Sequence, residues 1–241
     1  MGTWVTVGHP DVPDIMEALG FDWVVFDTEH APIGPESLAS MIQALDPSKM
    51  CPLVRVGQVD QYLVKSALDM GAHGIVCPLV SSPREAASAV RFAKYPPLGV
   101  RGVAPRKAAE YGLRSSEYLG SANRLTVVAV QIETKEAVAD IDSITAEAGV
   151  DIAFVGPTDL TFSLGLGTDR NNPKVLEAMG TVLESCARSG KVPGILASTP
   201  DEAMRAVEMG FRFVGLGSDV RFMIAGAKLF LDEVEKYRKP G

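Results

Sequence analysis

Short runs of apolar, β-branched residues alternate with helix-like segments along the whole chain, and this alternation restricts the possible folds more than any other feature. Such an order is typical of a parallel sheet with crossover helices. We predict eight strands, near residues 3–7, 22–27, 51–56, 73–77, 126–132, 151–155, 192–196 and 211–216. We predict helices near residues 11–19, 35–46, 59–70, 83–94, 134–148, 173–190, 200–209 and 219–237. Eight such units without a Gly/Ser-rich linker favour an α/β fold, a (β/α)8 TIM barrel, with a single domain over residues 1–241.

Four of the predicted strands end in ionisable residues that a buried strand does not normally keep. These residues are Asp27, Glu29 and His30 after the second strand, Arg55 after the third, Glu133 after the fifth and Asp159 after the sixth. α/β barrels carry their chemistry at the carboxyl ends of their strands. A set of carboxylates, one imidazole and one guanidinium suits metal-assisted chemistry on a small anionic substrate.

Composition excludes several classes of partner. The net charge of −7 and the pI near 5.1 argue against binding to nucleic acid or to an anionic membrane, because both require a basic face. No apolar run approaches the about 20 residues that span a bilayer, and because Met1-Gly2-Thr3-Trp4 enters a strand directly we expect no secretory signal. Three widely spaced cysteines, Cys51, Cys77 and Cys186, fit neither a disulfide framework nor a zinc motif. We therefore expect a cytoplasmic protein with reduced thiols.

Glu133 and Asp159 are the candidates for a metal site. They follow strands that are neighbours in a sequential barrel, and adjacent strands lie about 4.8 Å apart, so both carboxylates could reach one ion. Gln131 has the same parity as Glu133 and should also face the barrel interior. Carboxylates with open coordination positions suit Mg²⁺ or Mn²⁺. The alternative is that arginines neutralise the two acids.

His30 and Arg55 are the candidates for proton transfer and charge stabilisation. His30 lies three residues after Asp27, and a carboxylate that fixes the tautomer of an imidazole makes it a better general base. Arg55 can stabilise an enolate, or it can instead pair with Glu29 or Asp27. A Schiff-base lyase would need a lysine that points into the barrel, and the lysines map to helices, loops or strand beginnings. Metal chemistry is therefore favoured.

Residues 95–123 form a long connection between the fourth and fifth predicted strands, and it carries Arg101, Arg106, Lys107 and Arg114. Loops of this length usually act as lids or bind ligands. We expect this cationic segment to lie on the active face and contact substrate. The alternative is a solvated excursion on the surface.

Two further features lie near the end of the chain. Gly215-Leu216-Gly217-Ser218-Asp219 follows the last strand, where barrels often bind phosphate, but Asp219 would repel a phosphate, so phosphate binding stays open. The last helix, over residues 220–237, is apolar around more than one stripe. We expect it to pack on a second subunit as well as on its own barrel, which predicts a homo-oligomer.

Four motifs occur in order along the chain. They are Gly20-Phe21-Asp22-Trp23 leading to Asp27-Thr28-Glu29-His30-Ala31-Pro32, then Tyr95-Pro96-Pro97-Leu98-Gly99-Val100-Arg101-Gly102-Val103, then Gln131-Ile132-Glu133-Thr134, and finally Gly156-Pro157-Thr158-Asp159-Leu160. Together they resemble the class II, metal-dependent 2-oxo-acid aldolases of the HpcH/HpaI family, over nearly the whole chain. The resemblance implies an enzyme that reversibly cleaves a 4-hydroxy-2-oxo acid to pyruvate, or a close 2-oxo acid, and an aldehyde.

The resemblance also implies roles for the matching residues. Glu133 and Asp159 would bind the divalent metal, either Mg²⁺ or Mn²⁺ with Co²⁺ as a further candidate. Arg55 would stabilise the pyruvate enolate, and His30 paired with Asp27 would transfer protons.

The remaining substrate-binding residues implied in this way are Gln131, Gly156, Pro157, Thr158, Asp159, Leu196 and, from a neighbouring subunit, Asp69. The family further implies a hexamer, or trimer of dimers, with exchanged C-terminal helices.

The sequence departs from the family pattern at Thr28, where the family usually has glycine, and a β-branched residue there disfavours a positive φ. His73 and Pro105-Arg106-Lys107 are further departures, which we expect to lie where the aldehyde partner is selected.

The alternative functions are a metal-dependent 2-oxo-acid decarboxylase, a citrate-lyase-type CoA-thioester lyase and a non-catalytic metabolite-binding barrel. A CoA enzyme would need a nucleotide-sized cleft that the sequence does not identify. The complete set of acids, imidazole and guanidinium argues against a non-catalytic barrel.

Overall fold

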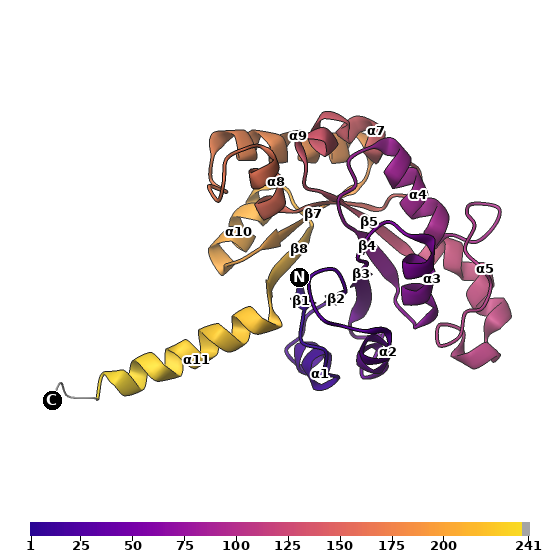
Figure 1. The fold of residues 1–241 in the computed structure, drawn as a ribbon, viewed down its shortest axis with the longest axis horizontal. Coiled ribbons are helices and arrows are strands. Elements are labelled where there is room, and N and C mark those ends of the chain that lie inside the picture. Colours follow the sequence, from indigo (N-terminus) through magenta and orange to yellow (C-terminus); the bar gives the residue numbers. More distant parts are fainter. Residues whose placement is uncertain (238–241) are drawn as a thin grey trace.

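The computed structural model describes residues 1–237. The predicted domain extends to residue 241, so its last four residues lie outside the described part. Eight parallel strands form a closed barrel in sequential order (Figure 1). The strands are β1 (Gly2–Val5), β2 (Trp23–Asp27), β3 (Cys51–Arg55), β4 (Gly74–Cys77), β5 (Val127–Ile132), β6 (Ile152–Val155), β7 (Val192–Ala197) and β8 (Phe213–Ser218). The predicted TIM barrel and all eight predicted strands are confirmed, with small differences at the ends.

Large aromatic rings fill the interior of the barrel. Trp4, Trp23 and Phe154 belong to a buried cluster separate from the larger core between strands and helices, and Phe213 packs against it. The rings of Trp23 and Phe213 stack with centroids 3.9 Å apart. A Cβ atom at Gly2 would lie 1.9 Å from the Trp23 ring, so only glycine leaves the space that this packing needs. The filled interior leaves the carboxyl ends of the strands as the place for a site.

Helices follow the strands, and most of them cover the outside of the barrel. They are α1 (Asp11–Ala18), α2 (Pro35–Gln43), α3 (Gln61–Asp69), α4 (Pro83–Ala93), α5 (Ser115–Leu125), α6 (Lys135–Ala139), α7 (Ile141–Thr145), α8 (Pro157–Ser163), α9 (Pro173–Ser189), α10 (Pro200–Met209) and α11 (Asp219–Glu235), with a 3₁₀ turn η1 at Glu110–Gly112. The single helix predicted over 134–148 is wrong, because the chain turns at Asp140 and forms α6 and α7. The short helix α8 was not predicted.

The connection between β4 and β5 differs from the prediction in two ways. It contains α5, and the segment joins the end of α4 to the start of β5. In a (β/α)8 barrel the end of a helix and the start of the next strand lie at the amino end of the barrel. The expected place of residues 95–123 on the active face is therefore wrong. His73 immediately precedes β4, so its expected place near the aldehyde is wrong for the same reason.

Helix α11 projects away from the barrel as a long arm (Figure 1). Its only buried residue is Asp219 at its first position. Its exposed large apolar residues are Val220, Met223, Ile224, Leu229, Phe230, Leu231 and Val234. None of the helices within residues 1–237 combines the length and the apolar character that crossing a membrane requires.

Candidate active site

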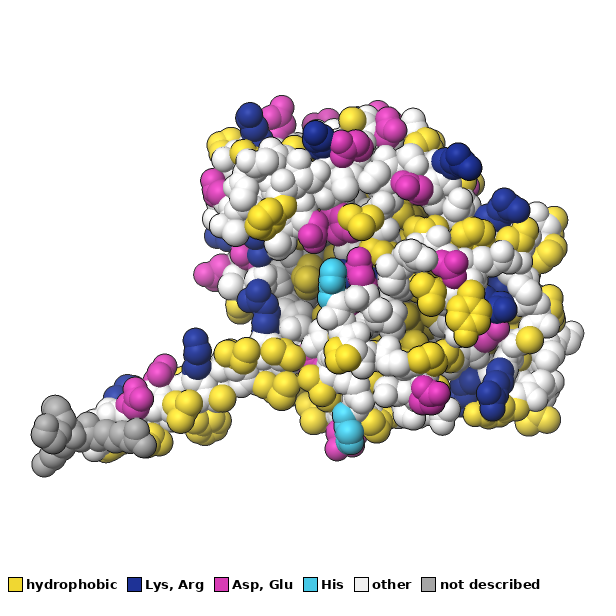
Figure 2. All heavy atoms as spheres, in the orientation of Figure 1, with side chains coloured by type: hydrophobic (Ala, Val, Ile, Leu, Met, Phe, Trp, Pro, Cys, Tyr) yellow, Lys and Arg dark blue, Asp and Glu magenta, His cyan; other side chains and the backbone are white. Residues whose placement is uncertain are grey.

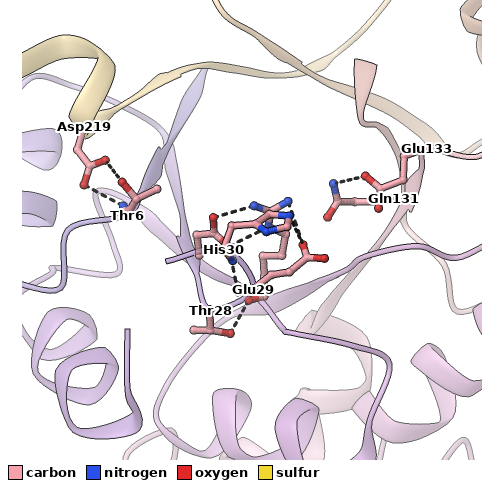
Figure 3. Close-up of polar contacts among 9 residues, drawn as sticks. Thr6, Thr28, Glu29, His30, Gln131, Glu133 and Asp219 are labelled. Carbon is pink, nitrogen blue, oxygen red and sulfur yellow. Dashed lines mark hydrogen bonds and ion pairs between the residues drawn. The ribbon is translucent and has the colours of Figure 1, made fainter. Parts of the chain in front are cut away.

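The strand-end residues gather at the carboxyl end of the barrel (Figure 3). Glu29 and His30 lie on one side of the opening, and Gln131 and Glu133 lie across from them. Figure 2 shows a histidine and acidic side chains beside the central hollow of the molecule. The predicted convergence of charged residues from separate strands is therefore present.

Arg55 is held by two carboxylates. Asp27 and Arg55 are paired positions at the ends of β2 and β3. The Arg55 Nε and Nη2 atoms donate to Asp27 Oδ1 and Oδ2 at 3.0 and 2.7 Å, and Nη1 lies 3.1 Å from Glu29 Oε2. Burial opposes ionisation of Asp27, but the hydrogen bond and charge of Arg55 prevail and hold the pKa of Asp27 below its ordinary value. These contacts agree with the alternative interpretation, in which Arg55 pairs with Asp27 and Glu29.

Within residues 1–237 Asp27 contacts the backbone of His30 and not its imidazole, so the expected pairing stays a prediction. Asp27 Oδ1 accepts the backbone N–H groups of Glu29 and His30, because the chain turns back directly after β2. The carboxylate beside the imidazole is Glu29, whose Oε2 lies 3.7 Å from His30 Nε2. The His30 side chain is 67% exposed, so the imidazole can meet a ligand in the opening. Burial is the main cause that raises the pKa of Glu29 above its ordinary value.

Glu133 is a deeply buried carboxylate of the opening, as exposed as Asp27. Its residue is 3% exposed, and burial raises its pKa to about 7, with the charges of Asp159 and Glu29 acting in the same direction. Its Oε1 accepts the Leu79 N–H at 2.7 Å, and its Oε2 accepts from Gln131 Nε2 at 3.1 Å. Leu79 aims its amide at Glu133 from a left-handed conformation with φ 51°, which is uncommon for a residue other than glycine.

Asp159 lies in the first turn of α8, directly after β6. Its side chain is exposed, as is Thr158, whereas Gly156 and Pro157 are buried. A Cβ atom at Gly156 would lie 2.5 Å from Glu133 Oε2, so glycine at this position gives Glu133 its space. Pro157 occupies the first position of α8.

The donors in this part of the opening fit a hard divalent cation. Glu133 and Asp159 supply carboxylate oxygens, and Gln131 Oε1 is buried without a hydrogen-bond partner among residues 1–237. Oxygen donors of this kind are those that Mg²⁺ prefers. Within the same range, no three His, Cys, Asp or Glu side chains form a group able to hold a metal ion. An ion bound by two carboxylates and an amide would therefore keep coordination positions for water or substrate.

The other predicted site residues lie in different places. Leu196, in β7, packs against the aromatic cluster of the barrel interior. Asp69 lies at the end of α3, where its Oδ1 accepts from Arg101 Nη2 at 2.6 Å, and it does not join the residues of the opening within this chain. The Thr28 hydroxyl donates to the Arg55 carbonyl oxygen at 2.6 Å. Thr28 has no positive φ, so the expected conflict between its β-branch and the backbone does not arise.

Two contributors were missed or undervalued in the sequence. Glu29 was considered only as a partner for Arg55, although its position next to His30 was visible. The Leu79 amide gave no signal, because a backbone donor and its conformation are not encoded in a residue type.

The question of a phosphate site after β8 is answered by Asp219. Its carboxylate accepts the backbone N–H groups of Thr6 and Val7 at 2.8 Å, the Thr6 hydroxyl at 2.7 Å and the N–H of Val220 at 2.8 Å (Figure 3). The chain's own anion therefore occupies three backbone donors next to the end of β8, which argues against a phosphate there.

Comparisons with known proteins agree with this geometry. Residues 1–225 match the HpcH/HpaI aldolase/citrate lyase family. A 4-hydroxy-2-oxo-heptane-1,7-dioate aldolase of Salmonella paratyphi C is 35% identical over 229 residues, which cover 95% of this chain and 87% of that protein. The crystal structure of an HpcH/HpaI aldolase/citrate lyase family protein from Burkholderia cenocepacia superimposes with a TM-score of 0.93 at 36% identity, covering 97% of this chain and 93% of the other. A citrate synthase structure superimposes with a TM-score of 0.88 at 28% identity, covering 98% and 93%.

Proposed function

Because the chain belongs to the HpcH/HpaI aldolase/citrate lyase family and is a carbon–carbon lyase of the aldolase type, we propose that it is a divalent-metal-dependent aldolase. Its substrate is a 4-hydroxy-2-oxo acid, which it cleaves reversibly to pyruvate, or a close 2-oxo acid, and an aldehyde. The observation that carries this proposal is the pair of oxygen donors Glu133 and Gln131, which lie across the opening from Glu29 and His30, with the charge of Asp159 close enough to raise the pKa of Glu133.

Glu133 and Asp159 hold the metal, with Gln131 Oε1 as a further donor. When bound, a Mg²⁺, Mn²⁺ or Co²⁺ ion supplies Lewis-acid polarisation of the 2-keto group and lowers the energy of negative charge that develops on its oxygen. The ion also supplies the counter-charge that a buried, ionised Glu133 otherwise lacks.

The chain's own residues orient the substrate and move the proton. Arg55 keeps a fixed guanidinium at the opening, because Asp27 holds it from two sides. This cation faces the charge that develops on the 2-oxo acid as the C3–C4 bond breaks. Backbone N–H groups of Thr158 and Asp159, in the first turn of α8, bind the substrate carboxylate, whereas Pro157 has no N–H and that of Gly156 donates to the Ile132 carbonyl oxygen.

His30 removes the proton of the C4 hydroxyl group, and Glu29 acts with it in place of Asp27. A carboxylate near an imidazole stabilises the imidazolium that forms when the proton arrives. Leu196 lines the apolar side of the site.

The oligomer is also part of the proposal. The apolar side chains of α11 would be covered by a second copy of the chain, with the helix packed on or exchanged with its neighbour, in a hexamer or trimer of dimers. Asp69 of a neighbouring subunit then contacts the substrate. Three free cysteines suit a cytoplasmic location.

The first experiment is exchange of the pyruvate methyl protons in D₂O, followed by NMR with Mg²⁺ or Mn²⁺ and then with EDTA. It tests enolisation without the unidentified aldehyde. We expect fast exchange that EDTA abolishes, and loss of exchange in Glu133→Ala and Asp159→Ala. Activity that ignores EDTA in the double variant would contradict the proposal.

A second candidate also passes through an enolate but forms or uses it differently. The citrate synthase at 28% identity favours a reaction in which loss of CO₂ from a 2-oxo acid such as oxaloacetate leaves the enolate, or one in which the enolate of a CoA thioester adds to the keto group of a 2-oxo acid, the reverse of a citrate-lyase-type cleavage. If pyruvate exchanges but no aldehyde reacts, CO₂ release from oxaloacetate and turnover of acetyl-CoA distinguish these reactions.

A further inference from the structure

A groove lies on the outside of the barrel, away from the carboxyl-end opening. It has a volume of about 330 Å³ and lies between α2, α3 and the segment before α5; the lining residues that matter here are Tyr62, Lys65 and Asp69 of α3 and Arg106, Lys107 and Tyr111 of that segment. Figure 2 shows Lys and Arg side chains gathered on the side of the molecule where α3 and α5 lie. Of these side chains the proposed reaction uses only Asp69, which would reach the substrate of a neighbouring subunit.

The groove holds an excess of positive charge on a protein with a net charge of −7. Lys65, Arg106 and Lys107 line it, and within residues 1–237 none of the three forms an ion pair. The other two cations of the segment are already neutralised, since Arg101 pairs with Asp69 and Arg114 pairs with Glu110 and Glu117.

Asp69 is the one carboxylate among the residues that line the groove. Its Oδ1 lies 2.6 Å from Nη2 of Arg101, whose side chain is fully buried. Arg101 therefore compensates much of the charge of Asp69, which also interacts with Lys65, and a single carboxylate faces three cations in the groove. Like charges in a concave site concentrate the field and attract an anion.

Contacts within the chain keep the cations in place. The Lys107 N–H donates to the Asp69 carbonyl oxygen at 3.1 Å, which ties the segment to the end of α3. The stem of Lys107 runs beside Gly71, where a Cβ atom would lie 3.3 Å from Lys107 Cγ. The Lys65 ammonium lies 5.7 Å from the centre of the Tyr62 ring.

The rim of the groove is strained. Glu110 and Tyr111 have positive φ values of 49° and 57°, and non-glycine residues rarely adopt them. This turn places Tyr111 on the wall of the groove, with a hydroxyl group that can donate to a ligand. Strain of this kind collects at ligand sites, where the surrounding structure maintains it.

We propose that this groove binds a small dianion, such as a dicarboxylate, a sulfate or a phosphate, between Lys65, Arg106 and Lys107. The groove and its charges are separate from the metal-binding group of the same chain, so anion binding there goes beyond the aldolase reaction and can be tested apart from it. The link to the substrate of a neighbouring copy rests on the proposed function. The ligand is either a separate effector or the far carboxylate of a substrate that enters a neighbouring copy.

Titration calorimetry of the full-length protein with sulfate and with succinate, at constant ionic strength, tests the proposal. Arg106→Gln/Lys107→Gln should weaken saturable binding at least about tenfold, because charge-assisted hydrogen bonds are lost. The control Arg124→Gln/Lys174→Gln removes the same charge from exposed positions outside the groove and should leave binding within about twofold, since salt screens distant charges. Thermal melting checks that each variant is folded.

Equal weakening in both double variants, or no saturable binding by the wild type, would overturn the site. A second measurement separates the two sources of the ligand. If the groove serves the substrate, Arg106→Gln/Lys107→Gln lowers the ratio of kcat/KM for succinic semialdehyde to that for butanal. If it binds a separate effector, this ratio stays constant while sulfate binding is lost. The binding result stands even if the protein turns over neither aldehyde.

Discussion

Among single residues, Glu133 experiences the strongest opposition between burial and charge. Its carboxyl group is buried beside Gln131 and Gly156, with the acids Glu29 and Asp159 close enough to raise its pKa further. The protonated form suits this environment, whereas the ionised form needs a cation. This single group therefore connects stability, pH and metal binding.

In EDTA, the pH dependence of stability should reveal Glu133. The unfolded chain releases this proton near pH 4.5 and the folded chain near pH 7, so the free energy of unfolding should fall as pH rises between these values. The difference corresponds to about 3 kcal/mol, at roughly 1.4 kcal/mol for each pKa unit. Glu133→Gln should lack this fall, and urea unfolding of both proteins at about pH 5 and about pH 8 measures it. The same pH dependence in both proteins would contradict the assignment.

Arg55→Lys tests whether the shape of the guanidinium matters in addition to its charge. Lysine keeps the charge but cannot donate to both oxygens of Asp27 and also reach Glu29. We expect kcat to fall at least about tenfold, because a fixed cation at the developing charge is lost. Steady-state kinetics measure the change, and the control Arg114→Lys alters only pairs with the exposed Glu110 and Glu117. Equal kcat values for wild type and Arg55→Lys would remove Arg55 from the chemistry.

At the scale of elements, the junction between β6 and α8 controls the space around the metal-binding group. Gly156 lies between the last residue of β6 and the first residue of α8, next to Glu133. Asp159 lies in the first turn of α8. The loop after β4 approaches Glu133 from the other side through the Leu79 amide. Three separate elements thus position one carboxylate.

Gly156→Ala should disturb this junction. The added methyl group would lie 2.5 Å from Glu133 Oε2, so either the side chain or the backbone must move. We expect a loss of about 1–3 kcal/mol in the free energy of unfolding, as for other overpacked sites, together with weaker Mn²⁺ binding. Denaturation and titration calorimetry measure the two effects. In the control Gly180→Ala, in α9, the new methyl group meets no atom within 4 Å, and stability should be unchanged or rise by about 0.5–1 kcal/mol.

At the scale of the whole molecule, the barrel buries its apolar side chains, whereas α11 exposes them to solvent. The strands and the inner faces of the helices bury the core, whereas α11 exposes a run of large apolar side chains beyond the barrel. Exposed apolar surface of this extent indicates a contact with another molecule. A second copy of the same chain presents the same helix and is therefore the simplest partner.

Phe230→Asp should reduce the assembly to smaller species. Phe230 is 76% exposed in the isolated chain, and a carboxylate in a buried subunit contact would remain unpaired. We expect light scattering coupled to size-exclusion chromatography to report a lower mass at the same protein concentration. Lys228→Glu, a charge change at an exposed polar position of the same helix, is the control. A monomeric wild-type protein would contradict this prediction.

Local patterns were sufficient for the barrel and for the list of charged residues in its opening. Strand and helix periodicity repeat every few residues, and the ends of strands are visible where apolar runs stop. The order of elements also contained the correct place of residues 95–123, since a segment between a helix and a strand returns to the amino end of a barrel. The length of this segment favoured the active face, but the order of elements decides its place.

The partners of these residues depended on the tertiary structure. The sequence by itself determined that Asp27, Glu29, His30, Arg55 and Glu133 would meet at one end of the barrel. It did not determine that Asp27 holds Arg55, that a Leu79 amide reaches Glu133, or that Asp219 occupies the donors after β8. These contacts join atoms from distant segments over a few ångströms, and backbone conformation and burial select among several partners of equal charge. Residue type alone specifies neither the backbone conformation nor the burial of a side chain.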